Sequence, residues 1–125
     1  GLIMRRDMDL VRYILLKVGE SKGCVNARDL LCDEYDDLEQ IYYHVKIMTE
    51  TGLISSRTVA KRTRGHQKVR CTIESITLYG NDLLNVFDND IVWNKTKNKI
   101  QTILGDAPLE VYEHVAKEII KDMVY

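Results

Sequence analysis

The sequence predicts an α+β fold: a winged helix-turn-helix core, made of helices and a basic β-hairpin wing, followed by a C-terminal helical extension. Three observations predict this class. An amphipathic helix ends at Thr51-Gly52, the run 69–76 alternates as a strand does, and the basic segment 57–70 connects them. A chain of 125 residues is long enough for one compact domain. We therefore expect residues 4–80 to form the core and residues 81–125 to pack on it as helices.

Two helices are predicted in the first part of the chain. Asp7 caps the first, whose apolar residues recur every three or four positions until Gly19. The second spans residues 37–51, with Asp36 or Asp37 as its cap and Gly52 as the left-handed residue after its end. Between them, residues 26–32 fit a short helix or an edge strand equally well.

The hairpin is predicted from two runs rich in β-branched residues, 53–60 and 69–78. Its tip is expected at residues 64–67, where Gly65 permits a positive φ.

Further helices are predicted after the hairpin. Thr77 caps one that runs through Phe87 to a break at residues 88–90. The next has the apolar residues Ile91, Val92, Trp93, Ile100, Ile103 and Leu104 and ends at Gly105. The last begins with Asp106 as its cap and has the predicted buried residues Leu109, Tyr112, Val115, Ala116, Ile119 and Met123. This last helix either closes the core of the monomer or pairs with a second copy in a homodimer.

Charge is distributed very unevenly along the chain. The segment 57–70 holds six of the 18 Lys and Arg residues and none of the 19 Asp and Glu residues, which leaves 12 basic against 19 acidic groups elsewhere. Such an asymmetry indicates a polyanionic partner. The predicted DNA-binding residues are Arg57, Lys61, Arg62, Arg64, Lys68 and Arg70.

Alternate residues of a strand face opposite ways, so not all six basic side chains can contact one ligand. The residues nearest the tip are the strongest candidates for binding phosphates or entering a narrow minor groove. The alternative is a solvated loop whose charges only keep exposed strand edges from pairing.

The helix at residues 37–51 is the second candidate DNA contact. Gln40, Tyr43 and Lys46 lie on its predicted outer face and are expected to orient the protein on DNA or to contact bases. The same face also carries Glu39 and Glu50, and its net negative charge opposes phosphate. A contact with another protein fits this face equally well.

Four strings in the chain resemble an uncharacterised bacterial and prophage family. They run from Arg5 to Leu16, from Tyr43 to Ile54, from Ile76 to Leu84 and from Ile91 to Lys95. Members of that family usually carry Thr-Trp-Glu-Gly-His, where this chain has Leu78-Tyr79 for Trp-Glu and Asn81 for His. The resemblance implies a winged-helix fold and a mobile-element setting, and it brings no established activity with it.

We expect no metal site, cofactor or catalytic activity. The histidines and cysteines lack the short ligand spacing of structural zinc sites, and no nucleophile elbow, Walker loop or His-Glu-x-x-His string occurs. His44 is interpreted as a residue on the flank of a helix and His66 as a loop residue. Trp93 beside alternating lysines fits an aromatic platform for nucleic acid, but a buried core residue is the favoured interpretation.

The protein is expected to be cytoplasmic. The sequence has no apolar stretch of about 20 residues and no apolar signal-peptide core after its basic N-terminus. Its three cysteines, Cys24, Cys32 and Cys71, are expected to be reduced and mostly buried thiols.

These observations together give the hypothesis of a phage- or plasmid-type transcriptional regulator that contacts duplex DNA mainly through its basic wing. The rival is a winged helix that binds another protein and no nucleic acid. A positive face continuous from the wing to Lys46 favours DNA, whereas an isolated wing beside an acidic helix favours a protein partner.

Overall fold

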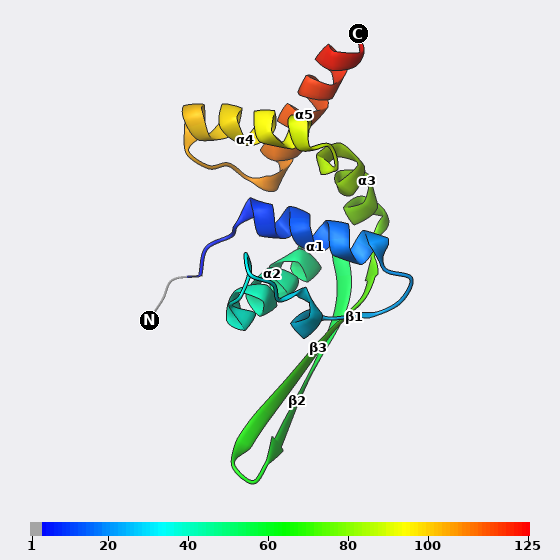
Figure 1. Cartoon of the computed structure of the whole chain (residues 1–125), viewed down its shortest axis with the longest axis vertical. Helices are drawn as coiled ribbons and strands as arrows, with labels where there is room; N and C mark the ends of the chain where they lie inside the picture. The colour runs from blue at the N-terminus through cyan, green and yellow to red at the C-terminus, as the bar shows by residue number, and fades with distance from the viewer. Residues whose placement is uncertain (1–3) are drawn as a thin grey trace. The chain divides into compact units, whose positions relative to one another are not determined.

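The computed structural model describes residues 4–125, which form a mixed α+β fold with five α-helices and a small antiparallel sheet (Figure 1). The elements in chain order are α1 (Met8–Glu20), β1 (Val25–Asn26), the 3-10 helix η1 (Ala27–Leu30), α2 (Leu38–Glu50), β2 (Ile54–Thr63), β3 (His66–Ile76), α3 (Leu78–Phe87), α4 (Asp90–Leu104) and α5 (Leu109–Val124). The chain divides into two compact units, one ending at Asn81 and the other spanning Asp82–Tyr125.

The helices of the first unit begin at the predicted aspartates. The Asp7 carboxylate accepts the backbone N–H groups of Asp9 and Leu10, and the Asp37 carboxylate accepts that of Glu39. Each cap satisfies backbone donors that the first helical turn leaves unpaired. Gly52, with φ of 77°, follows the end of α2 as predicted. The ambiguous segment contains both expected elements, since the short strand β1 runs directly into η1.

Three antiparallel strands form the sheet, in the order β1-β3-β2. The short β1 pairs with β3 only at its base, through Val25 with Ile73 and Asn26 with Thr72. The core side of β3 carries Cys71 and Ile73, which are both buried. Ser55 is opposite Ser75 and Ser56 is opposite Ile73, so the ladder contains a β-bulge at this point.

Beyond the bulge, β2 and β3 continue as a two-stranded arm that extends past helices α1 and α2 (Figure 1). The pairing runs without a break to Thr63 and His66, so the turn consists of Arg64 and Gly65 alone. Both turn residues have positive φ, 53° and 79°, as a type I′ turn requires. The strands are thus longer at the tip than predicted, and the loop is two residues shorter.

A tight contact joins the start of α3 to the base of the hairpin. The Thr77 hydroxyl accepts the N–H of Gly80, as a predicted cap should, while the Thr77 N–H donates to the Leu53 carbonyl. A Cβ atom on Gly80 would lie 2.0 Å from that same carbonyl oxygen. Glycine is therefore required here by the close approach of two backbones.

An aromatic cluster forms the core of the second unit. The ring centroids of Phe87 and Trp93 are 4.7 Å apart, and those of Trp93 and Tyr112 are 6.0 Å apart. Trp93 is buried, which agrees with its favoured interpretation. The predicted cap Asp106 is wrong, because Pro108 occupies the N-cap position of α5 and the Asp106 carboxylate accepts the Tyr112 hydroxyl instead.

Several predicted core residues of the second unit are exposed. They are Ile91, Ile103, Leu104 and Met123. Helical periodicity shows which residues share a face, and these residues lie toward the ends of α4 and α5, where the neighbouring helix does not cover them.

Candidate nucleic-acid interface

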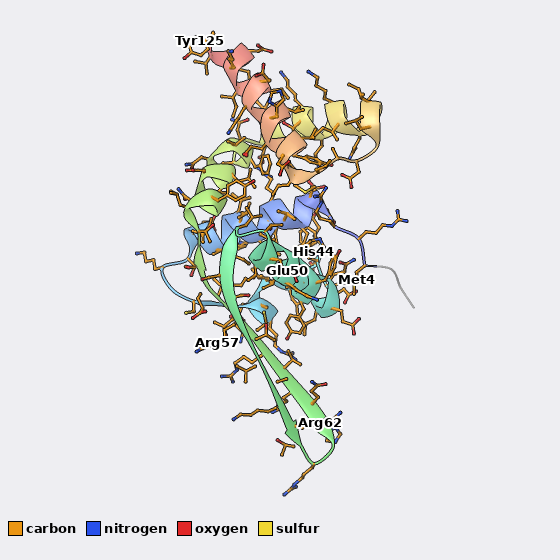
Figure 2. The ribbon with its side chains drawn as sticks, turned by 180° about the vertical axis from the view of Figure 1, so that it is seen from behind. Met4, His44, Glu50, Arg57, Arg62 and Tyr125 are labelled. Carbon is orange, nitrogen blue, oxygen red and sulfur yellow. The ribbon has the colours of Figure 1, made fainter. Side chains whose placement is uncertain are left out.

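The hairpin arm, which we define as Arg57–Arg70, is almost entirely open to solvent. Every residue from Arg57 to Lys68 is exposed, as is Arg70. Figure 2 shows the side chains of the arm, with Arg57 nearer the base and Arg62 nearer the tip. Since so little apolar surface is buried along the arm, its amino-acid composition is not dictated by packing.

The strand register gathers four of the six predicted cations on one face. Residues directly opposite each other share a face, and faces alternate along each strand. Lys61 pairs with Lys68 and Val59 with Arg70, while Arg57 is opposite Thr72. The resulting cationic face consists of Arg57, Lys61, Lys68 and Arg70. Arg62, opposite Gln67, is on the other face, and Arg64 is at the turn.

The cationic face is electrostatically unfavourable in the isolated protein. Lys61 and Lys68 are directly opposite, where like charges destabilise an antiparallel pair. No carboxylate occurs between Arg57 and Arg70 to offset them. Within residues 4–125, none of the four side chains forms an ion pair or hydrogen bond. The repulsion is therefore relieved only by solvent, dissolved ions or an anionic partner.

The cationic face points away from α2 where the arm leaves the sheet. Ser56 belongs to the other face, and its hydroxyl is 2.7 Å from the Thr49 hydroxyl of α2. Helix α2 therefore packs on the side of the sheet opposite Arg57. At the base of the arm, the predicted DNA contacts of the arm and those of α2 therefore lie on opposite sides of the sheet and do not form one surface.

The α2 ridge, which consists of Glu39, Tyr43, Lys46 and Glu50, is the outer side of that helix. Both glutamates and Lys46 are exposed, whereas Tyr43 is half-buried with its ring edge against His44. The third predicted contact, Gln40, has its side-chain oxygen buried and without a hydrogen-bond partner. Of the three predicted side chains on α2, only Lys46 is fully available, and two carboxylates flank it.

His44 is a core residue, so its interpretation as a flanking residue is wrong. Its side chain is fully buried, with Nδ1 2.8 Å from the Gln40 carbonyl and Nε2 accepting the N–H of Asp7 at 2.8 Å. The ring thus joins α2 to the start of α1 in its neutral form, with the proton on Nδ1. Burial lowers the pKa of His44, although the Gln40 carbonyl and the Asp7 carboxylate act in the opposite direction.

The interpretation of His66 as a loop residue is wrong, because His66 belongs to a strand of the arm. It is the first residue of β3, opposite Thr63 and in step with Lys68, so it lies on the same side of the hairpin as the cationic face, nearer the tip. A signal for it was present in the sequence. A two-residue turn at Arg64-Gly65 fixes the pairing of every following residue.

The thiols differ from expectation, because Cys24 and Cys32 are exposed and only Cys71 is buried. In residues 4–125, His, Cys, Asp and Glu side chains form no group of three suited to a metal ion. No helix in the described part of the chain is long and apolar enough to span a bilayer. Met123, Val124 and Tyr125 are exposed at the end of α5, and the homodimer through this helix remains a prediction.

Together the fold and the arm define a small α+β protein with a two-stranded basic projection. Residues 5–106 match the family described as "Hypothetical protein (DUF2513)", and the chain belongs to this family. It is 32% identical over 126 residues to an "Uncharacterized protein" of Haemophilus influenzae, which covers 97% of this chain and 99% of that relative. No solved structure matches the chain.

Proposed function

We propose that the first unit is a winged helix that binds duplex DNA through its hairpin arm. The element order supports the fold assignment, since a helix, a short strand, a helical turn, a second long helix and a hairpin follow each other in the winged-helix sequence. The sheet order β1-β3-β2, in which the short β1 pairs only with the base of β3, also supports this assignment. In this proposal η1 stands in place of the second helix.

The observation that carries the DNA assignment is the cationic face. Edge protection alone needs only a charge or two on an open strand, whereas this face concentrates cations from both strands opposite each other. A polyanion removes their mutual repulsion and releases its own counterions on binding. No Phe, Tyr or Trp occurs between Ile54 and Ile76, a range that includes the whole arm. It therefore lacks the stacking platforms of single-strand binders, which favours a duplex.

The proposal includes modest sequence specificity, a cytoplasmic location and a regulatory role of the phage or plasmid type. Phosphate contacts position a protein without reading sequence, so a surface made mostly of such contacts discriminates weakly between sites. Lys46 and the half-buried Tyr43 contribute little to this surface, because the cationic face is turned away from α2 at its base.

Fluorescence anisotropy of a labelled random duplex, measured at several salt concentrations, tests this function. Four phosphate contacts give a slope of log affinity against log salt of about −3.6. The variant Lys61→Gln/Lys68→Gln removes two of them, so we expect a slope shallower by about 1.8. The same variant removes a repulsive cross-strand pair, and its hairpin should be no less stable than that of the parent.

The matched control is Lys95→Gln/Lys99→Gln on α4, where both lysines are exposed. It removes the same net charge from the second unit and should leave the slope within about 0.5 of the parent value. A parent that is folded and binds no duplex at low salt would end the DNA assignment. An equal loss in both double variants would show that net charge, and not the arm, drives binding.

The second candidate is a winged helix that binds another protein, and one observation favours it. Lys46 lies between Glu39 and Glu50 and does not join the cationic face, so the positive surface is not continuous. The exposed acidic residues Asp33, Glu34, Asp36 and Asp37 precede this helix. If the duplex experiment fails, affinity capture with the parent and a Glu39→Lys/Glu50→Lys variant tests the α2 ridge as the docking surface.

A further inference from the structure

The turn of the hairpin contains an unusual residue. Arg64 has φ of 53°, and among residues 4–125 it is the one residue other than glycine with positive φ. The first position of a type I′ turn favours Asn, Asp or Gly, whose local bonding or lack of Cβ suits this conformation. Arginine has neither property, so its presence at this position works against the hairpin.

No contact within the described residues compensates for this strain. Arg64 is exposed, and its guanidinium group makes no ion pair or hydrogen bond with residues 4–125. Strained backbone that the surrounding structure does not explain is a feature of ligand-contacting sites. The benefit of arginine at this position is therefore expected outside the chain.

The shape of the tip limits what Arg64 can reach. The major groove, about 12 Å wide, admits a two-stranded ribbon, whereas the minor groove is only about 6 Å wide. Only the two-residue turn is narrow enough for the smaller groove, and Gly65 adds no side chain to it. Arg64 is the one basic residue of this two-residue turn, so it is the cation at the end of the arm.

We infer that Arg64 is a specificity-determining residue that enters the minor groove and favours A·T-rich duplexes. The minor groove of A-tracts is narrow and has an enhanced negative potential, which attracts an arginine side chain. The floor of a G·C groove carries the guanine amino group, which obstructs the same insertion. This inference rests on the proposed function and adds a preference that phosphate contacts alone do not provide.

The test compares three duplexes of equal length at one salt concentration: an A-tract, a G·C duplex, and an inosine–cytosine duplex. Inosine lacks the amino group of guanine, so the minor groove of the inosine–cytosine duplex resembles that of A·T. Its major groove still resembles that of G·C. We expect the full-length parent to bind the A-tract and inosine duplexes roughly five- to tenfold more tightly than the G·C duplex. For Arg64→Asn we expect the preference to fall to about twofold or less.

Arg64→Asn also protects the test against misfolding, since asparagine is preferred at this position and should keep or raise the thermal stability of the hairpin. The matched control Arg62→Asn removes the same charge from the opposite face and should keep the preference. Equal binding of all three duplexes by the parent, or an unchanged preference in Arg64→Asn, would overturn the inference. Salt-sensitive binding whose slope becomes shallower in Lys61→Gln/Lys68→Gln would then still support the proposed function, and only absence of duplex binding removes both.

Discussion

The hairpin arm and the α2 ridge are both exposed polar surfaces of the first unit, but their charges are organised differently. On the arm, cations from two strands share one face and have no carboxylate among them. On α2, Lys46 lies between two glutamates of the same ridge. The ridge combines both signs and has a net charge of −1 from Glu39, Lys46 and Glu50, whereas the arm carries positive charge alone, which dissolved salt screens and an anionic partner neutralises. Solvent exposure is therefore a weaker guide to a binding surface than the way neighbouring charges are combined.

The largest expected effect comes from removing the whole cationic face. Arg57→Gln/Lys61→Gln/Lys68→Gln/Arg70→Gln should weaken duplex binding on the order of a thousandfold at low salt, at about 1 kcal/mol for each charged side chain that no longer binds a phosphate. Lys46→Gln should change affinity by less than about twofold. Both are measured by anisotropy with the same random duplex. A comparable weakening in the two variants would break the comparison, because it would put α2 in the interface.

An intermediate effect concerns the inner side of α2, which we regard as scaffold. His44 in the unfolded chain titrates near its ordinary pKa of 6.5, and burial lowers the pKa in the folded chain. The stabilisation by neutral His44 is therefore fully present above pH 6.5. It declines as the pH falls below that value, because the unfolded state then binds the proton more readily. Denaturant unfolding between pH 7.5 and pH 5 should show this decline.

His44→Gln is the matched control for this pH dependence. Its side-chain oxygen can still accept the N–H of Asp7 but does not titrate, so the decline should be shallower in the variant. Arg6 and the Asp7 carboxylate also act on this histidine and are unchanged in the variant. Identical pH profiles for the two proteins would mean that another group causes the acid sensitivity.

The smallest expected effect is at the outer side of α2. Glu39→Gln/Glu50→Gln removes two negative charges from the ridge and should tighten duplex binding by less than about twofold at 0.1 M salt, where the Debye length is about 10 Å. Titrations at 0.05 M and 0.2 M salt would check this. A gain above about fivefold would show that the duplex approaches the ridge, and the contrast between the two surfaces would then be smaller than we propose.

Much of the fold could be predicted from local chemistry. Asp7, Asp37 and Thr77 have short side chains that bond to the first turn of a helix, and each begins the predicted one. The exposed Ile103 and Leu104 were predicted wrongly because a pattern of apolar residues does not say whether another element covers them. His44 was missed for a related reason, since its burial depends on a backbone N–H 37 residues away.

The candidate site was predictable in composition but not in arrangement. The basic segment is apparent from composition alone. The register of the arm would also have been predictable if Arg64-Gly65 had been assigned as a two-residue turn. The sequence did not show that Gln40 turns its side-chain oxygen inward or that α2 packs on the opposite side of the sheet. Those facts depend on tertiary packing, which local patterns do not encode.

The β-bulge at the base of the hairpin determines which side of the sheet the cations of β3 occupy. Ile76 is opposite the buried Ile54, and Ile73 is itself buried, so both β3 residues are on the core side of the sheet. They are three residues apart, although residues of a regular strand share a side only when an even number of positions separates them. A regular strand counted back from Ile76 would place Lys68 and Arg70 on the side of Ile76. The unpaired Glu74 absorbs the odd step, so both cations emerge on the outer side, beside those of β2. One extra residue thus places Lys68 and Arg70 on the same side of the hairpin as Arg57 and Lys61, and it leaves Arg62 as the one basic residue of the opposite strand face.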